Sequence, residues 1–176
     1  MLAATGLTAK EFAPGSTATS MLAAQQLGVQ ADQIAKSLLF VGKDGRFFMV
    51  VSPGDRRISS SKLKAATGVK SRMASADETL AATGFGPGAV CPFGVDGTIS
   101  VFIDRSLSAY DMIYPSAGTD SSGVPMTFKV LVAITGAAWG ILSPRRQKNS
   151  CDREASVTAA AILSLQAHGS KVARRG

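Results

Sequence analysis

Two short apolar runs, residues 38–41 and 46–51, are separated by the four residues Gly-Lys-Asp-Gly. The Asp-Gly pair tolerates the positive φ angles that a tight turn between antiparallel strands requires. The pattern therefore predicts a β-hairpin over residues 38–51. Although the turn contains two glycines and a lysine, it lacks the spacing and the Lys-Ser/Thr ending of a phosphate-binding loop.

Four further segments are predicted to be helical because each stops at a glycine, the residue that most readily ends a helix. Three of them also follow serine or threonine, which favour helix starts. In the third, Ser75 with Glu78 three residues later resembles a capping box. The four segments are residues 18–27, 62–67, 76–83 and 129–135.

Short apolar segments predict additional strands between and after these helices. They are residues 98–103, 112–114, 126–128 and 137–142. Residues 104–108 form a polar turn, in which Asp104 is expected to cap the backbone before Ser106. We therefore predict a single α+β domain with a mixed, mostly antiparallel, curved sheet packed with helices.

Charge divides the chain at about residue 144. The net charge is +7 over 176 residues, but residues 1–144 carry 12 Lys/Arg against 10 Asp/Glu, whereas residues 145–176 carry seven against two. We therefore predict a body, residues 1–144, that is not strongly basic as a whole and contacts few phosphates. Residues 145–176 are predicted to form a basic, partly helical C-terminal extension.

Composition excludes several classes of protein. No apolar run approaches the roughly 18 residues that a membrane-spanning helix needs, so no membrane association is expected. Cys91 and Cys151 lie in different sequence contexts, which argues against a disulfide framework and favours a reducing compartment. Residues 1–10 lack the basic start and apolar core of a secretion signal. We expect a cytoplasmic protein.

Candidate catalytic residues of the usual kinds are scarce. His168 is the single histidine and lies in the C-terminal extension. A Ser-His-Asp or Cys-His site in the body is therefore excluded, as is a His/Cys metal cluster, and we expect no metal and no cofactor. Asp104 and Asp111 could form a carboxylate pair, but capping of a turn is the better explanation of Asp104.

Two features could nevertheless form a site. Lys36 precedes the apolar residues 38–41, where a lysine either extends to solvent from a strand edge or is held at a pocket wall. Residues 84–94 contain four glycines and two prolines, without the Gly-x-Gly-x-x-Gly spacing of dinucleotide-binding loops. Such a loop either presents backbone amides to one oxygen or connects a helix to a strand. From residue types alone, the structural explanation is favoured for both features.

Five motifs occur in a consistent order along residues 11–142, among them Gly-Ala-Val-Cys-Pro at residues 88–92. The others lie within residues 16–29, 33–38, 101–104 and 116–118. Together they resemble the YbaK and prolyl-tRNA-synthetase-associated domain family. The resemblance implies an α+β fold with a pocket beside the sheet. It also implies a trans-editing deacylase, an enzyme that hydrolyses the ester joining a wrong amino acid to a tRNA.

The resemblance also implies roles for individual residues. Lys36 is similar to the family lysine that holds the phosphate or ribose of the terminal adenosine, and Gly88 and its neighbours would offer backbone amides to the ester carbonyl. The ribose hydroxyl beside the ester is expected to assist the attacking water, which suits a body without histidine. The other expected substrate-binding residues are Ser37, Ala89, Val90, Cys91, Pro92, Phe93, Gly94, Ser116, Ala117 and Gly118.

The chain departs from the alanine-specific branch of this family at two places. It has Ser37 where that branch has asparagine, and Pro115-Ser116-Ala117 where that branch has a His-Pro loop. We therefore expect the substrate to be tRNA(Pro) or a related tRNA carrying a small wrong amino acid, with alanine disfavoured. Cys91 lacks a neighbouring base, so its thiol is mostly protonated at neutral pH and we interpret it as a small pocket-lining or core residue.

A second interpretation belongs to a different functional class. The chain could be a non-catalytic module that binds aminoacyl-tRNA, or a small aminoacyl compound, and delivers it to a synthetase. Both interpretations name aminoacyl-tRNA as the partner, and an aminoacyl-tRNA synthetase is a further candidate.

Overall fold

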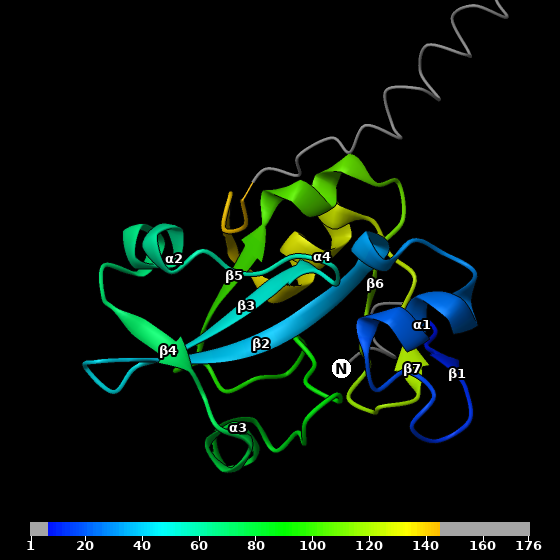
Figure 1. Ribbon diagram of the computed structural model, residues 1–176, viewed down its shortest axis with the longest axis horizontal. Helices are drawn as coiled ribbons and strands as arrows, with labels where there is room; N and C mark the ends of the chain where they lie inside the picture. Colours follow the sequence, from blue (N-terminus) through cyan, green and yellow to red (C-terminus); the bar gives the residue numbers. More distant parts are fainter. Residues whose placement is uncertain (1–6, 145–176) are drawn as a thin grey trace, which may run out of the picture. The chain divides into compact units, whose positions relative to one another are not determined.

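A hairpin of two long strands forms the centre of the fold. In the computed structural model, which describes residues 7–144, β2 (Ile34–Gly42) pairs antiparallel with β3 (Phe47–Pro53) over seven residue pairs. Figure 1 shows the two strands side by side across the molecule. The predicted hairpin is confirmed. Its strands are longer than predicted because β3 lies in the interior, where Met49, Val50 and Val51 are completely buried.

Four shorter strands complete a six-stranded sheet around this hairpin. They are β4 (Ser71–Met73), β5 (Ser100–Asp104), β6 (Tyr114–Pro115) and β8 (Ala138–Gly140). The order is β4, β2, β3, β5 and β8, with β6 paired to the start of β2. β4 is antiparallel to β2, whereas β6, β5 and β8 join the sheet through parallel pairings, which need longer connections. A mixed, open sheet in an α+β domain is thus confirmed.

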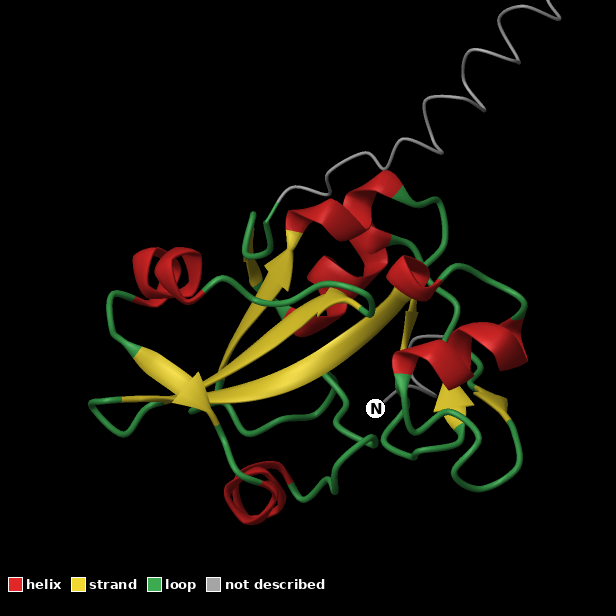
Figure 2. Ribbon diagram, viewed as in Figure 1, coloured by secondary structure: helices red, strands yellow, loops and turns green. Residues whose placement is uncertain are grey.

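Four helices lie around the sheet (Figure 2). They are α1 (Ser20–Leu27), α2 (Ser60–Thr67), α3 (Ala76–Thr83) and α4 (Phe128–Thr135), with shorter 3₁₀ helices η2 (Ala31–Gln33) and η3 (Arg105–Ala109). The four predicted helices are confirmed, and each ends at a glycine in the left-handed conformation. The capping box is present: the Ser75 hydroxyl accepts from the Glu78 amide at 3.2 Å, and the Glu78 carboxylate accepts from the Ser75 amide at 2.8 Å.

Three short strands were not predicted. Besides β4, these are β1 (Lys10–Glu11) and β7 (Ser122–Gly123), which pair antiparallel in a separate two-stranded sheet. Their residues are polar or small and carry no alternating pattern, so pairing with distant residues decides their conformation. Two predicted strands are shorter than expected, because Ile113 and Met126 form one isolated bridge and Phe128 already begins α4.

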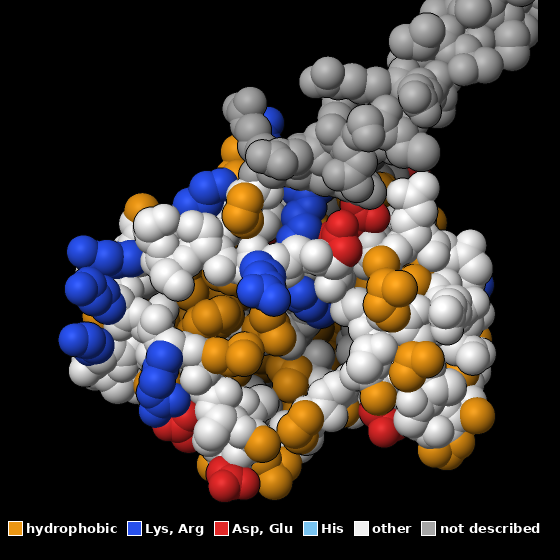
Figure 3. All heavy atoms as spheres, viewed as in Figure 1, with side chains coloured by type: hydrophobic (Ala, Val, Ile, Leu, Met, Phe, Trp, Pro, Cys, Tyr) orange, Lys and Arg blue, Asp and Glu red, His pale blue; other side chains and the backbone are white. Residues whose placement is uncertain are grey.

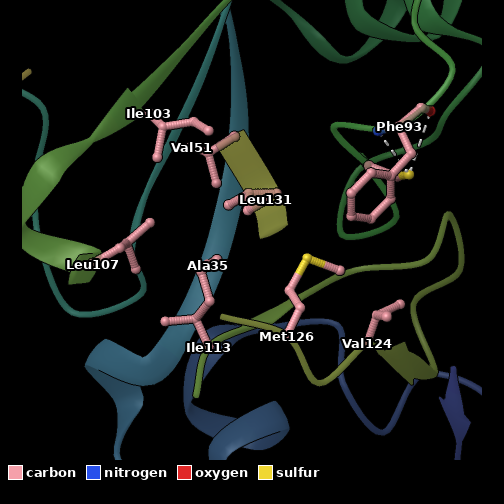
Figure 4. Close-up of a cluster of buried hydrophobic side chains, with 10 residues drawn as sticks. Ala35, Val51, Phe93, Ile103, Leu107, Ile113, Val124, Met126 and Leu131 are labelled. Carbon is pink, nitrogen blue, oxygen red and sulfur yellow. Dashed lines mark hydrogen bonds between the residues drawn. The ribbon is translucent and has the colours of Figure 1, made fainter. Parts of the chain in front are cut away.

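The main hydrophobic core holds the start of β2 in place. Ala35 of β2 packs in one buried cluster with Val51, Ile103 and Leu131, which come from β3, β5 and α4 (Figure 4). Burial of this many apolar side chains is the principal stabilising contribution to such a fold. Lys36, the next residue along β2, is therefore attached to a rigid part of the molecule.

Asp104 is a buried carboxylate that holds the end of β5. It accepts hydrogen bonds from the Ser106 amide at 2.9 Å, the Ser106 hydroxyl at 2.8 Å and the Ser143 amide at 2.6 Å. Burial alone would raise the pKa of Asp104, but the hydrogen bonds from Ser143 and Ser106 outweigh it and the pKa is lowered. The predicted capping role is confirmed.

Within residues 7–144, no helix combines the length and the apolar character needed to cross a membrane. The predicted helical extension over residues 145–176 lies outside the described residues, and so do Cys151 and His168.

Candidate active site

A cavity of about 230 Å³ lies beside the first half of β2. On the side of β2 away from β3, β6 pairs with Ile34 and Ala35, and β4 pairs only from Phe40 onward. Among the described residues, no strand pairs with this edge of β2 between Ala35 and Phe40, and this unpaired part borders the cavity. Five of the predicted site residues line it: Lys36, Ser37, Gly88, Val90 and Ser116.

The start of α1 and the residues just before it form another part of the cavity wall. Thr17, Thr19 and Ser20 line it, and Thr19 caps the helix by accepting a hydrogen bond from the Leu22 amide at 3.2 Å. The positive end of the α1 dipole therefore lies at the cavity. A run of serine and threonine before a helix is typical of a helix start, so the residue pattern did not mark these hydroxyls as part of a site.

Lys36 carries the cation of the cavity. Its ammonium donates to the carbonyl oxygens of Gly54 at 3.0 Å and Arg56 at 2.6 Å, in the loop that follows β3. Burial lowers the pKa of Lys36 below its usual value, and the Asp55 carboxylate offsets part of that shift. An ammonium has three N–H donors, so one remains for a ligand.

The loop held by Lys36 packs tightly against the start of α1. A Cβ atom on Gly54 would come within 2.5 Å of both the Ala31 carbonyl oxygen and the Ser20 Cβ. Glycine is therefore required at position 54 for this contact. The Lys36 ammonium therefore holds a loop that contacts Ser20, one of the hydroxyl residues lining the cavity.

Gly88 brings the backbone of the glycine-rich loop to the cavity. Its φ is +83°, a conformation that favours glycine, and a Cβ there would lie 3.2 Å from the Ala18 carbonyl oxygen. The Ala89 amide donates to the Gly86 carbonyl at 3.1 Å, whereas the amides of Gly88 and Val90 have no acceptor within the described part of the chain. Because Gly88 and Val90 both line the cavity, their amides are candidate donors to a ligand oxygen.

The remaining predicted residues of this loop lie behind it. Cys91 and Phe93 belong to the main hydrophobic core, and the Cys91 sulfur accepts from the Phe93 amide at 3.3 Å (Figure 4). Burial raises the pKa of Cys91, and the hydrogen bond from Phe93 lowers it by less. Pro92 is buried as well, while Ala89 and Gly94 do not line the cavity. Cys91 therefore lies in the core, with a thiol that is harder to ionise than usual.

The Ser116 loop contributes one side chain to the cavity. The Ser116 hydroxyl donates to the Thr119 carbonyl at 3.0 Å and accepts from the Gly118 amide at 3.2 Å. The Ala117 amide donates to the Ser122 hydroxyl at 3.2 Å. Ser122 lines the cavity, whereas Ala117 packs on the core and Gly118 does not line it. This loop is ordered by its own hydrogen bonds.

Ser37 is the most unusual polar residue of the cavity. Its side chain is buried, and its hydroxyl has no hydrogen-bond partner among the described residues. A buried hydroxyl without a partner costs about 1 to 3 kcal/mol. Because Ser37 also lines the cavity, a bound ligand could satisfy it.

Comparison with known sequences places the chain among editing domains. The family model of the aminoacyl-tRNA editing domain matches residues 15–134. The uncharacterized protein YwhH of Bacillus subtilis (strain 168) is 38% identical over 116 residues, which cover 66% of this chain and 74% of that protein. A proline–tRNA ligase of Thermosipho africanus (strain TCF52B) is 45% identical over 74 residues, which are 42% of this chain and only 13% of the ligase.

Comparison with solved structures agrees. A protein described, provisionally, as a trans-editing enzyme for prolyl-tRNA synthetase superposes with a TM-score of 0.73 at 33% identity, covering 79% of this chain and 87% of that one. A hypothetical protein superposes with a TM-score of 0.76 at 29% identity, covering 81% and 96%. By sequence and by fold, therefore, this chain belongs to the aminoacyl-tRNA editing domain family.

Proposed function

We propose that this chain hydrolyses the ester bond of a mischarged aminoacyl-tRNA, with tRNA(Pro) or a related tRNA carrying a small wrong amino acid as substrate. The observation that carries the proposal is that Lys36 and Gly88, which lie far apart in the sequence, line one cavity. A cation with a spare donor and two free amides then adjoin the same bound group.

In the proposed complex, Lys36 positions the substrate. Its remaining N–H donates to a phosphate or ribose oxygen of the terminal adenosine, while the carbonyls of Gly54 and Arg56 hold the ammonium in place. A charged hydrogen bond of this kind contributes about 1.5 to 3 kcal/mol. Correct placement of the ester is a large part of what an activated substrate requires.

In the proposed reaction, the amides of Gly88 and Val90 stabilise the transition state. Water attacks the ester carbonyl carbon, and negative charge develops on the carbonyl oxygen that faces these amides. The neighbouring ribose hydroxyl relays the proton of the water. The bond between the carbonyl carbon and the ribose oxygen then breaks, and that oxygen takes up the proton. One well-placed amide donor contributes about 3 kcal/mol to such a transition state.

The test is hydrolysis of tRNA(Pro) charged with Cys, Ser, Thr or Ala by the wild type and by Lys36→Ala. We expect kcat/KM of the variant to fall roughly 10- to 100-fold on the preferred substrate, because one charged hydrogen bond is lost. A matched control is Lys62→Ala, since the Lys62 ammonium also donates to a backbone carbonyl, that of Ser143 at 2.5 Å, but does not line the cavity. Equal activity of Lys36→Ala and the wild type would remove Lys36 from the mechanism.

The same experiment separates the enzyme from a binding module. Retained binding of charged tRNA by the wild type, without turnover of any of the four substrates, would support delivery to a synthetase instead. We propose a synthetase as a further partner because several relatives are proline–tRNA ligases, in which the matched segment is a small part of a longer chain.

A further inference from the structure

The near balance of charge over residues 1–144 conceals a strong asymmetry. Residues 36–72 carry nine Lys/Arg against two Asp/Glu, whereas the rest of residues 1–144 carries three against eight. Residues 36–72 include most of β2 and β4 and all of β3 and α2, elements that adjoin one another in the fold. The basic residues are therefore concentrated on one part of the molecule.

Four of these cations meet where β2, β3 and β4 come together, and we call Lys43, Arg46, Lys70 and Arg72 the basic end. Lys43, Lys70 and Arg72 line one shallow hollow of about 430 Å³, and the Lys43 amide donates to the Lys70 carbonyl at 2.9 Å. Figure 3 shows Lys and Arg side chains gathered over the part of the molecule where Figure 1 labels β4.

The two lysines of the basic end are not neutralised. Arg46 pairs with Asp44 at 2.7 Å, and Arg72 pairs with Glu78 at 2.7 Å. Lys43 and Lys70 are exposed, and no carboxylate within residues 7–144 forms an ion pair with either. Two adjacent lysines without counter-charges are an electrostatic cost to the free protein that a polyanion relieves.

The basic end is joined to the cavity by a single strand. β2 runs from Lys36, at the cavity, to Gly42, next to Lys43. At about 3.3 Å per residue, these six steps span roughly 20 Å. Successive phosphates of a DNA strand advance about 3.4 Å along the axis, and on that scale the span corresponds to about six nucleotides. Figure 3 shows exposed apolar side chains over the part of the molecule where Figure 1 labels β2 and β3, with Lys or Arg side chains beside them.

We propose that Lys43 and Lys70 bind the phosphate backbone of the tRNA acceptor arm when its acylated end occupies the cavity. The proposal rests on the proposed function, which places that end beside Lys36. A chain-like polyanion anchored in the cavity suits a basic surface reached along one strand. Lysine binds phosphate as a point charge and needs no fixed geometry, which agrees with the exposure of both side chains.

The test compares Lys43→Ala/Lys70→Ala with Lys10→Ala/Lys129→Ala, a control that removes two exposed lysines from β1 and α4. Binding of uncharged tRNA by the full chain is measured from 50 to 300 mM salt, roughly the range over which counterion release is resolved. We expect the first variant to bind roughly tenfold more weakly, with a log–log salt slope reduced by about 1.4 to 1.8, because two phosphate contacts are lost. The control keeps the wild-type slope.

A second measurement uses an aminoacylated CCA trinucleotide, which is too short to reach the basic end. We expect the first variant to hydrolyse it at the wild-type rate while kcat/KM on full-length charged tRNA falls. An unchanged salt slope, equal losses in the control, or an equal loss on the trinucleotide would overturn the proposal. So would preserved tRNA binding with lost binding to vesicles of phosphatidylserine, which would assign the lysines to a membrane. If the wild type hydrolyses no charged tRNA, the proposed function fails, and the salt slope still decides this inference.

Discussion

The cavity and the basic end lie at opposite ends of β2 and are built in different ways. At the cavity, two carbonyls hold the ammonium of Lys36, and two bonds within its own loop hold the Ser116 hydroxyl. At the basic end, Lys43 and Lys70 are exposed and have no ionic partner in the described part of the chain. The difference fits the two proposed roles, because catalysis needs fixed geometry whereas affinity for a polyanion needs only charge.

The largest expected effect on the cavity comes from substitution of Gly88. In Gly88→Ala the new Cβ meets the Ala18 carbonyl at 3.2 Å and the left-handed φ is strained, so the two free amides shift. We expect kcat/KM on charged tRNA to fall about 100-fold, the loss expected when an oxyanion donor is misplaced. Gly84→Ala is the control: φ is +74° there, but nothing lies within 4 Å of the added Cβ. Both variants should lose about 1 kcal/mol of stability in denaturant unfolding; a comparable loss of activity in both would contradict the assignment of Gly88.

The buried carboxylate of Asp104 does not line the cavity, and its substitution is expected to affect the stability of the fold. Asp104→Asn places an amide N–H₂ among the donors of Ser106 and Ser143, and we expect it to lower the free energy of unfolding by about 2 kcal/mol. Because the folded pKa of Asp104 is lowered, its contribution is present above the usual carboxylate pKa of 3.8 and is lost as pH falls below that value. Urea unfolding between pH 3 and 7, roughly the range spanning this titration, checks the result. A variant as stable as the wild type at pH 7 would refute it.

Substitution of Ser37 tests whether its unpartnered hydroxyl contacts a substrate bound in the cavity. Removing an unpartnered buried hydroxyl in Ser37→Ala should leave the free energy of unfolding unchanged or raise it by up to about 1 kcal/mol. The same change should alter kcat/KM for Ser-, Thr- and Cys-charged tRNA by unequal factors of a few-fold. Competition between differently charged tRNAs measures those factors. Identical ratios in wild type and variant would mean that Ser37 does not contact the substrate.

The smallest expected effect concerns the pH dependence of Lys36. Since its folded pKa lies below the usual 10.5, the charged form is disfavoured on folding, and stability rises as pH increases from the folded pKa toward 10.5. The variant Lys36→Met has no ionisable group at this position and so lacks this pH-dependent contribution to stability. We therefore expect the stability difference, wild type minus variant, to grow as the pH rises toward 10.5 in chemical denaturation. Parallel curves for the two proteins would show that burial does not perturb this lysine.

Local signals predicted the parts of the fold that depend on neighbouring residues. The Asp44-Gly45 turn and the Ser75 capping box act within a few residues, and the hairpin and α3 form as expected. β4 and β7 are made by pairing with distant residues, so their short polar sequences gave no signal.

At the site, residue types alone favoured a structural explanation of Lys36 and Gly88, and only the family resemblance indicated a functional role for them. The same resemblance implied that Cys91 and Phe93 bind substrate, but the loop turns inward after Val90 and buries both in the core, the alternative already favoured for Cys91 alongside a pocket-lining position. The charge count over residues 1–144 averaged a basic region with an acidic one, so it missed the basic end.

The bonds from Lys36 to Gly54 and Arg56 affect how any substitution at this position should be interpreted. Truncation releases the loop beside α1 as well as deleting a positive charge, so the measured loss is an upper bound for the contact with substrate. Arginine does not avoid the problem, because its flat guanidinium cannot occupy the place of a compact ammonium between two carbonyls. A double-mutant cycle that pairs Lys36→Met with removal of the phosphate or ribose oxygen proposed to contact it isolates the direct contribution of Lys36 to substrate binding.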